Sequence, residues 1–141
     1  MTVNEIMNMA IAKGACSESG KASDWKSLAW LLFTPQGREF CAENSFPSLE
    51  TWRGIKESMT GELPVRIDSG TIFEENPKDI ALIGDTIADL AYRGANVKHN
   101  LIVMHGAKAR VYVKEWAVLH IVRIGSGCEV EVINDGTGVI V

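Results

Sequence analysis

The sequence predicts an α+β protein with two parts, a helical unit at residues 1–62 and a β-solenoid at residues 63–141. Three observations support this prediction. Apolar residues recur at helical spacing before residue 60, and they alternate with polar residues after Pro64. One short sequence motif then occurs twice, at 106–113 and at 125–132. A period of about 20 residues is typical of stacked coils, so we expect a short parallel β-helix.

Three or four short helices are expected in the first part. Each begins at a residue whose side chain accepts hydrogen bonds from the first turn of a helix. The expected caps are Thr2, Ser23 or Asp24, Thr34 and Ser48. The last helix is expected to continue to Gly61, where glycine favours a stop. A solenoid has two open ends, and we expect this helical unit to cap the first of them.

The second part is expected to contain only short strands and tight turns, because β-branched residues dominate it. Small aliphatic residues are expected to point inward and polar residues outward. The repeated phrase predicts that Asp89, Arg110 and Glu129 stack in one outward column of alternating charge. Strands every 8–11 residues also fit an antiparallel meander or a small barrel, and this alternative stays open.

Charge, hydropathy and cysteine spacing set expectations for the binding partners and the cellular location of the protein. The net charge of −4 is spread evenly, with no basic patch, so we expect no nucleic-acid partner. No apolar run reaches the roughly 18 residues that span a bilayer, and the N-terminus lacks the pattern of a signal peptide. Cys16, Cys41 and Cys128 share no metal-type spacing. Reduced thiols in the cytoplasm are therefore expected.

The pattern as a whole resembles short parallel β-helix proteins, with a helical N-terminal unit followed by a few coils of small residues such as 109–113. It is similar in style to uncharacterised small proteins of phages and mobile elements. This resemblance implies a role in assembly or interaction, and it implies no catalytic residue. The helical part of the chain contributes little to it.

Asp68-Ser69-Gly70-Thr71 resembles the phrase that supplies the catalytic carboxylate of aspartic proteases. Those enzymes bring two such carboxylates together to share one proton. The phrase occurs once here, so a homodimer would have to supply the second Asp. A dimeric aspartic hydrolase using Asp68 is therefore one alternative. The other is a turn between strands in which Asp68 binds backbone amides.

Histidine and arginine residues are the other candidates for chemistry. The spacings between His99, His105 and His120 match no standard zinc pattern, so neither a metal nor a cofactor is expected. A small-ligand binder is an alternative function, with a nucleotide or metabolite held between helices and solenoid or between subunits. Convergence of Arg93, His99, His105 and Arg123 at one cleft would favour it.

The end of the chain carries the main functional expectation. Residues 138–141 read as an apolar last strand, and an uncovered strand edge of this kind favours association. Trp116 lies at a turn and is expected to be exposed, as contact hot spots often are. We therefore expect a homo-oligomer, or a protein partner, to bury Trp116, Val139, Ile140 and Val141. The expected function is a non-enzymatic, self-assembling interaction or structural module.

Overall fold

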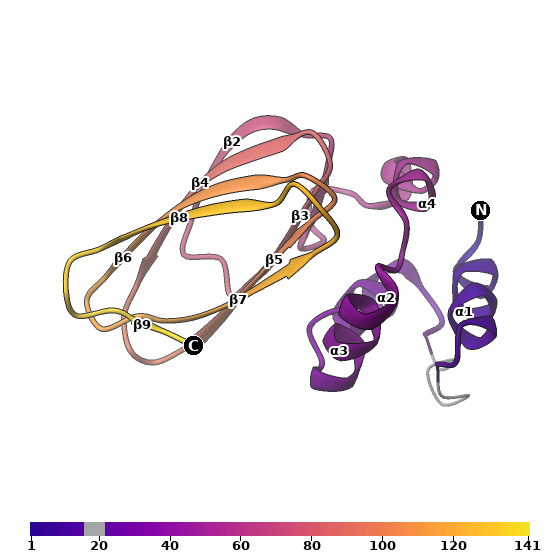
Figure 1. Cartoon of the computed structure of the whole chain (residues 1–141), viewed down its shortest axis with the longest axis horizontal. Coiled ribbons are helices and arrows are strands. Elements are labelled where there is room, and N and C mark those ends of the chain that lie inside the picture. Colours follow the sequence, from indigo (N-terminus) through magenta and orange to yellow (C-terminus); the bar gives the residue numbers. More distant parts are fainter. Residues whose placement is uncertain (16–21) are drawn as a thin grey trace. The chain divides into compact units, whose positions relative to one another are not determined.

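The computed structural model describes residues 1–15 and 22–141, so the expectation for Cys16 lies outside the described residues. The chain divides into two compact units, Met1–Leu63 and Pro64–Val141, each with its own secondary structure (Figure 1). The class is α+β, with helices in the first unit and two parallel sheets in the second. None of the described helices combines the length and the apolar character that crossing a membrane requires.

Short helices form the first unit. They are α1 (Val3–Ala12), α2 (Trp25–Leu31), α3 (Pro35–Asn44), α4 (Leu49–Gly54) and the 3₁₀ turn η2 (Lys56–Ser58). The side chains of Thr2, Asp24, Thr34 and Ser48 cap the four α-helices by accepting a backbone N–H three residues on. These starts are as predicted. The expected continuation of the fourth helix to Gly61 is wrong, because α4 ends at Gly54, a poor helix former, and gives way to η2.

The strands of the second unit are listed in chain order: β1 (Val65–Ile67), β2 (Gly70–Glu75), β3 (Asp79–Ile83), β4 (Thr86–Arg93), β5 (Lys98–Met104), β6 (Lys108–Lys114), β7 (Val118–Ile124), β8 (Glu129–Asn134) and β9 (Val139–Ile140). They alternate between a five-stranded sheet, β1-β3-β5-β7-β9, and a four-stranded sheet, β2-β4-β6-β8. All seven strand pairs are parallel. The alternative of an antiparallel meander or barrel is therefore wrong.

The turns explain why neighbouring strands do not form hairpins. Each turn carries the chain from one sheet to the other, so a strand pairs with the strand two further along (Figure 1). Gly84, Gly106 and Gly125 have φ of 67°, 91° and 81° at three of these turns. Glycine adopts such left-handed conformations without the steric cost that other residues incur. The repeated glycines thus mark the turns between sheets.

The register of the four-stranded sheet corrects the predicted charge column. Asp89 pairs with Arg110 and Arg110 pairs with Glu131, so Glu131 occupies the position that was expected for Glu129. The strands are thus shifted by two positions relative to the alignment of the repeated phrases. The turn before β8 is longer than the turn before β6 and absorbs part of this shift. Inward and outward faces are unchanged, because a shift of two positions keeps a side chain on its face.

Side chains that point from each sheet toward the other form one apolar core. Its members come from β3 to β7 and include Leu82, Leu90, Val111 and Leu119, all with no exposed surface. Residues in register on successive strands of one sheet form columns in this core. Leu90, Val111 and Val132 make one such column, and Leu119 and Ile140 belong to another. These columns lead directly to the last strands.

Candidate functional site: the open end of the two sheets

The last strands β8 and β9, with Val141, form a surface that we call the open end. No described strand lies beyond β8 in the four-stranded sheet or beyond β9 in the five-stranded sheet. In Figure 1 these strands are the yellow members of the β unit. An uncovered last strand presents unpaired backbone groups, which is a ready template for another chain.

Core columns become exposed at this end. Val111 has no exposed surface, whereas Val132, the next residue in its column, is 38% exposed. Leu119 is likewise fully buried, and Ile140 beside it is 41% exposed. Val139 and Val141 are exposed as well. The inward aliphatic side chains of the last strands therefore lack the cover that their equivalents have one strand earlier.

Backbone groups of β8 also point away from the sheet. The N–H groups of Glu129 and Asp135 donate to Ala107 and Val113 on the β6 side. In a parallel pair, alternate residues bond to the same neighbouring strand. The N–H and C=O groups of Val130 and Val132 therefore face the free edge. This edge can accept the hydrogen bonds of one further strand.

The turn between β8 and β9 is held by its own side chains. Asn134 Oδ1 accepts the N–H groups of Gly136 and Gly138, each at 3.0 Å, and Asn134 Nδ2 donates to the Gly138 carbonyl. Asp135 Oδ1 accepts both the N–H and the hydroxyl of Thr137. These two hydrogen bonds lower the pKa of Asp135. The open end is thus a built surface, in which both last strands are fixed before any partner arrives.

The opposite end of the β unit is closed by an ion pair. Arg66 on β1 and Glu74 on β2 are in register with the inward residues Leu82 and Leu90, so both point between the sheets. The guanidinium donates through Nε and Nη2 to the two carboxylate oxygens, each at 3.0 Å. Such a two-bond pair satisfies both charges. The first strands therefore end on a paired polar group. The last strands end on exposed aliphatic groups together with Arg123, which follows Leu82 and Val103 in the inward column of Arg66.

Trp116 lies beside the open end, in the turn between β6 and β7. Its side chain is 65% exposed, and its backbone N–H donates to Thr137 Oγ1 in the last turn. Glu115 and Trp116 are both left-handed, with φ of 52° and 63°. A bulky residue in this conformation is a genuine outlier that costs folding free energy. Trp30 on α2, in the helical unit, is exposed to a similar extent, at 63%.

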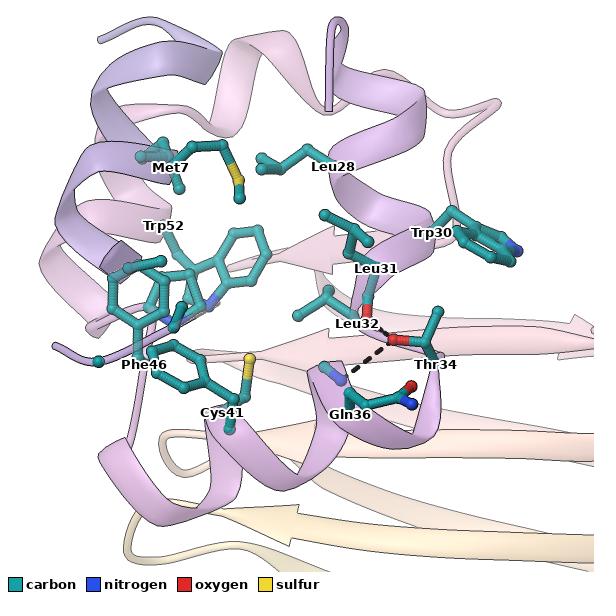
Figure 2. Close-up of a pocket in the computed structure, with 17 residues that line it drawn as sticks. Met7, Leu28, Trp30, Leu31, Leu32, Thr34, Gln36, Cys41, Phe46 and Trp52 are labelled. Atoms are coloured by element: carbon teal, nitrogen blue, oxygen red, sulfur yellow. Dashed lines mark hydrogen bonds between the residues drawn. The ribbon is translucent and has the colours of Figure 1, made fainter. Parts of the chain in front are cut away.

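The helical unit contains a cavity of about 660 Å³. Figure 2 shows side chains from all four α-helices around it, with the Trp52 indole among Phe46, Cys41 and Leu32. The lining is mainly aliphatic and aromatic. Thr34 is one polar member, but its hydroxyl already donates to the Leu31 carbonyl and accepts the Gly37 N–H. The cavity therefore suits an apolar molecule.

The pKa of the Cys41 thiol reflects the apolar surroundings of this cavity. Burial raises the pKa of the Cys41 thiol to about 12, because a thiolate loses its hydration there. A protonated thiol is a poor nucleophile, so Cys41 is a packing residue. Trp52 Nε1 is also buried, and it has no hydrogen-bond partner among the described residues. Nothing among the described lining residues therefore supplies a strong nucleophile near neutral pH.

The four residues proposed as ligand contacts do not share one cleft. His99 is buried at the start of β5, where Nδ1 donates to the Pro77 carbonyl at 2.8 Å and the ring packs on Tyr92. His105 follows the end of β5, so it is separated from His99 by the length of a strand. Arg93 ends β4 and Arg123 lies near the end of β7. None of the four lines the cavity in the helical unit.

The other candidate chemistry residues occupy structural positions. Asp68 Oδ1 accepts the Asp85 backbone N–H at 2.8 Å across neighbouring turns, as the turn interpretation requires. His120 is half-buried, and its register partner is Asn100, whose amide donates to Asp79. Within residues 1–15 and 22–141, no three His, Cys, Asp or Glu side chains are grouped to hold a metal ion. The hydrolase alternative stays a prediction, tested by turnover of an Asp68→Asn variant.

Comparisons of the chain with protein-family models, with curated proteins and with solved structures found no match. That Val139 to Val141 form an interface stays a prediction from the sequence. Val132 and the cavity of the helical unit are additional features that the sequence did not indicate.

Proposed function

We propose that this chain is a non-enzymatic interaction module, a helical unit joined to a short β-solenoid whose C-terminal end is covered by another polypeptide. The solenoid is supported by strands that alternate between two parallel sheets, with register partners one sequence repeat apart from β3 onward. The single observation that carries the function is the exposure of core columns at β8 and β9. The role of the helical unit as a cap, and an origin in a phage or mobile element, stay predictions.

Physical chemistry supports a cover on this end. Aliphatic surface gains about 25 cal/mol for each Å² that leaves water, and free strand edges gain hydrogen bonds when another strand pairs with them. Ile140 and Val132 supply the apolar surface, and the backbone of Val130 and Val132 supplies the edge. The sequence predicts either a second copy of the chain or a protein partner as this cover. Trp116 would extend the contact beyond the two strands.

The first test is native mass spectrometry of the purified protein, with hydrogen exchange of the same sample. We expect a species in which the amides of Val132 and Ile140 are protected by an associated chain. Ile140→Lys should abolish the association, because it places a charge in the buried contact. Ile87→Lys is the matched control, since Ile87 is an exposed aliphatic residue on the outer face of β4. Where the purified protein associates, loss of association in both variants, or in neither, would contradict the proposal.

A second candidate function is supported by the cavity of the helical unit, which is a site for a small apolar molecule. Its 660 Å³ lies within the usual range of small-molecule pockets, roughly 300–1,000 Å³. It differs from the expected pocket in place, because its lining comes from the helical unit by itself. A native mass spectrum with retained extra mass would favour this function over self-association.

The cavity can be tested with Nile red as an apolar probe. Ala10 lines the cavity, so Ala10→Leu should fill space and weaken probe binding several-fold. Ala12→Leu makes the same change at an exposed position of the same helix and should leave binding unchanged. Equal probe binding by both variants would remove the cavity from consideration.

A further inference from the structure

The charges on the outer face of the four-stranded sheet identify the kind of chain that the β8 edge accepts. Lys108 and Glu129 are register partners with Nζ and Oε2 3.6 Å apart, and Arg110 and Glu131 are partners with Nε and Oε2 3.2 Å apart. Asp89 stands on the other side of Arg110. Charge therefore alternates over three strands in the Arg110 column, whereas the Lys108 column has one charge pair and continues to the uncharged Ile87. The next position in each column, beyond β8, calls for a basic residue.

Both carboxylates of β8 remain available to a further strand. The Glu129 and Glu131 side chains are 72% and 63% exposed, although each has a basic neighbour on β6. A strand added to β8 would lie about 4.8 Å away, which brings its side chains as close as those of β6. Opposite charges on adjacent strands stabilise their pairing, and like charges directly opposite destabilise it.

A second copy of the chain does not provide this complement. Antiparallel pairing of β8 with itself about Glu131 places that carboxylate opposite its own copy. Pairing about Val132 places Glu129 opposite Asp135. Head-to-tail stacking of two copies would place β2 of one copy beside β8 of the other. The outward residues of β2 include Thr71 and Phe73 and no Lys or Arg. No such arrangement of the described strands puts a basic side chain over Glu129 or Glu131.

We propose that the β8 edge binds an extended segment of a different polypeptide that carries Lys or Arg at alternate positions. Two basic side chains lie over Glu129 and Glu131, the aliphatic residue between them covers Val130, and the aliphatic residue after the second one covers Val132. The backbone of the segment takes the hydrogen bonds that Val130 and Val132 leave at the free edge. This inference rests on the proposed function, because it names the chain that covers the open end.

The strand β6 supplies a matched probe. Its sequence, Lys-Ala-Arg-Val-Tyr-Val-Lys at 108–114, already pairs with the other edge of β8 in this pattern of charge. A capped synthetic peptide of this sequence should bind the folded protein, and its affinity should fall as salt rises. A control peptide with each Lys and Arg replaced by Glu should not bind. Isothermal titration calorimetry at two salt concentrations measures the affinity of each peptide and its dependence on salt.

Two variants separate a role in binding from a role in folding. Glu131→Gln should lower the affinity of the protein for the synthetic peptide of β6 sequence (the β6 peptide) about threefold, which is the usual effect of losing one exposed ion pair. Arg110→Gln breaks the same intramolecular pair but keeps the Glu131 carboxylate, so peptide affinity should be kept or increased. Circular dichroism checks that both variants are folded. Equal weakening by both would show that the pair acts through folding and would overturn the inference.

The outcomes distinguish this inference from the function on which it rests. Binding of the acidic and the basic peptides alike would overturn the charge argument and leave the open end as an interaction site. A closed homo-oligomer with protected Val130 and Val132 amides would also overturn the inference while supporting the proposed function. A bare monomer that binds neither peptide, with both amides exchanging freely, would overturn both.

Discussion

Replacing valine by alanine at two positions of one core column compares the contribution of a covered and an uncovered side chain to the free energy of unfolding. Val111 and Val132 are register partners on β6 and β8, so the two substitutions remove the same atoms from the same column. Val111 has no exposed surface, and Val132 is 38% exposed. The two variants therefore differ in their surroundings and not in their chemistry.

The expected costs follow from burial. Two methyl groups contribute about 1.6 kcal/mol to the free energy of unfolding at about 0.8 kcal/mol per buried carbon. Val111→Ala also leaves a closed cavity, which raises its cost to about 2–3 kcal/mol. Val132 is partly in solvent, and its removal leaves no closed cavity, because no described strand lies beyond β8. Val132→Ala should therefore cost about 1 kcal/mol in a dilute sample, in proportion to its smaller buried area.

Urea unfolding followed by circular dichroism gives both free energies. The measurement should be repeated at high protein concentration and with the β6 peptide present, because a bound chain adds to stability by mass action. Under conditions where a chain covers the open end, the cost of Val132→Ala should approach that of Val111→Ala. Equal costs in a dilute sample that is shown to be monomeric would refute the assignment of Val132 to an uncovered position.

Three further predictions concern single residues. Trp116→Gly should raise the free energy of unfolding by about 1 kcal/mol, because glycine adopts the left-handed conformation without strain, and thermal unfolding measures this gain. The same substitution should weaken any association that uses the indole, which native mass spectrometry measures. Cys41 should resist iodoacetamide at about pH 8 in the folded protein and react in urea, because its pKa of about 12 keeps the thiol protonated. The Ser27 hydroxyl and N–H lower the pKa of Asp24 below 3.8, so its contribution to stability is present above that pH and is lost as the pH falls through the folded-state pKa. Asp24→Asn should remove this acid-dependent loss of helicity, and circular dichroism across the acid range would show whether it does.

The starts of the helices could be predicted because capping is local. Thr2, Asp24, Thr34 and Ser48 each bond to a backbone N–H three residues away, and this information lies within one turn of sequence. The end of α4 at Gly54 was missed. A periodic apolar pattern continues through Ile55 and Met59, and both are buried, but the backbone that carries them is no longer α-helical. Periodicity reports which residues are buried more reliably than where a helix ends.

The faces of the strands could be predicted, and their stacking could not. Alternation of apolar and polar residues places Val111 and Val132 on the inward side, because successive side chains of a strand point to opposite faces. Stacking depends on the length of the turns between strands. Similar glycine phrases at 106 and 125 suggested Arg110 over Glu129, whereas the structure pairs Arg110 with Glu131. A match between turn phrases does not fix the register of the strands that follow them.

The Arg66–Glu74 pair and the cavity were out of reach for a different reason. Arg66 and Glu74 lie on strands of different sheets, and only the fold turns both side chains toward the same interior. The cavity depends on how side chains of several helices fail to fill the space between them, which no single segment records. Features that need several elements at once have no local signature in the sequence.

The contrast between the two ends of the β unit supports the proposal that another polypeptide covers the C-terminal end. At the first strands, a half-buried arginine and glutamate form an ion pair in which each charge has its partner within the chain. A similar solution was accessible at the last strands, where Val132 lies in the same column as Glu74 and Ile140 also faces inward. Instead Val132 and Ile140 lie there together with Arg123, which continues the inward column of Arg66. Asn134 holds the turn by hydrogen bonds, and acidic groups lie along the free edge. The charges at the first strands are thus neutralised within the chain, whereas aliphatic and charged groups are exposed together at the last strands, and this difference supports the proposed partner there.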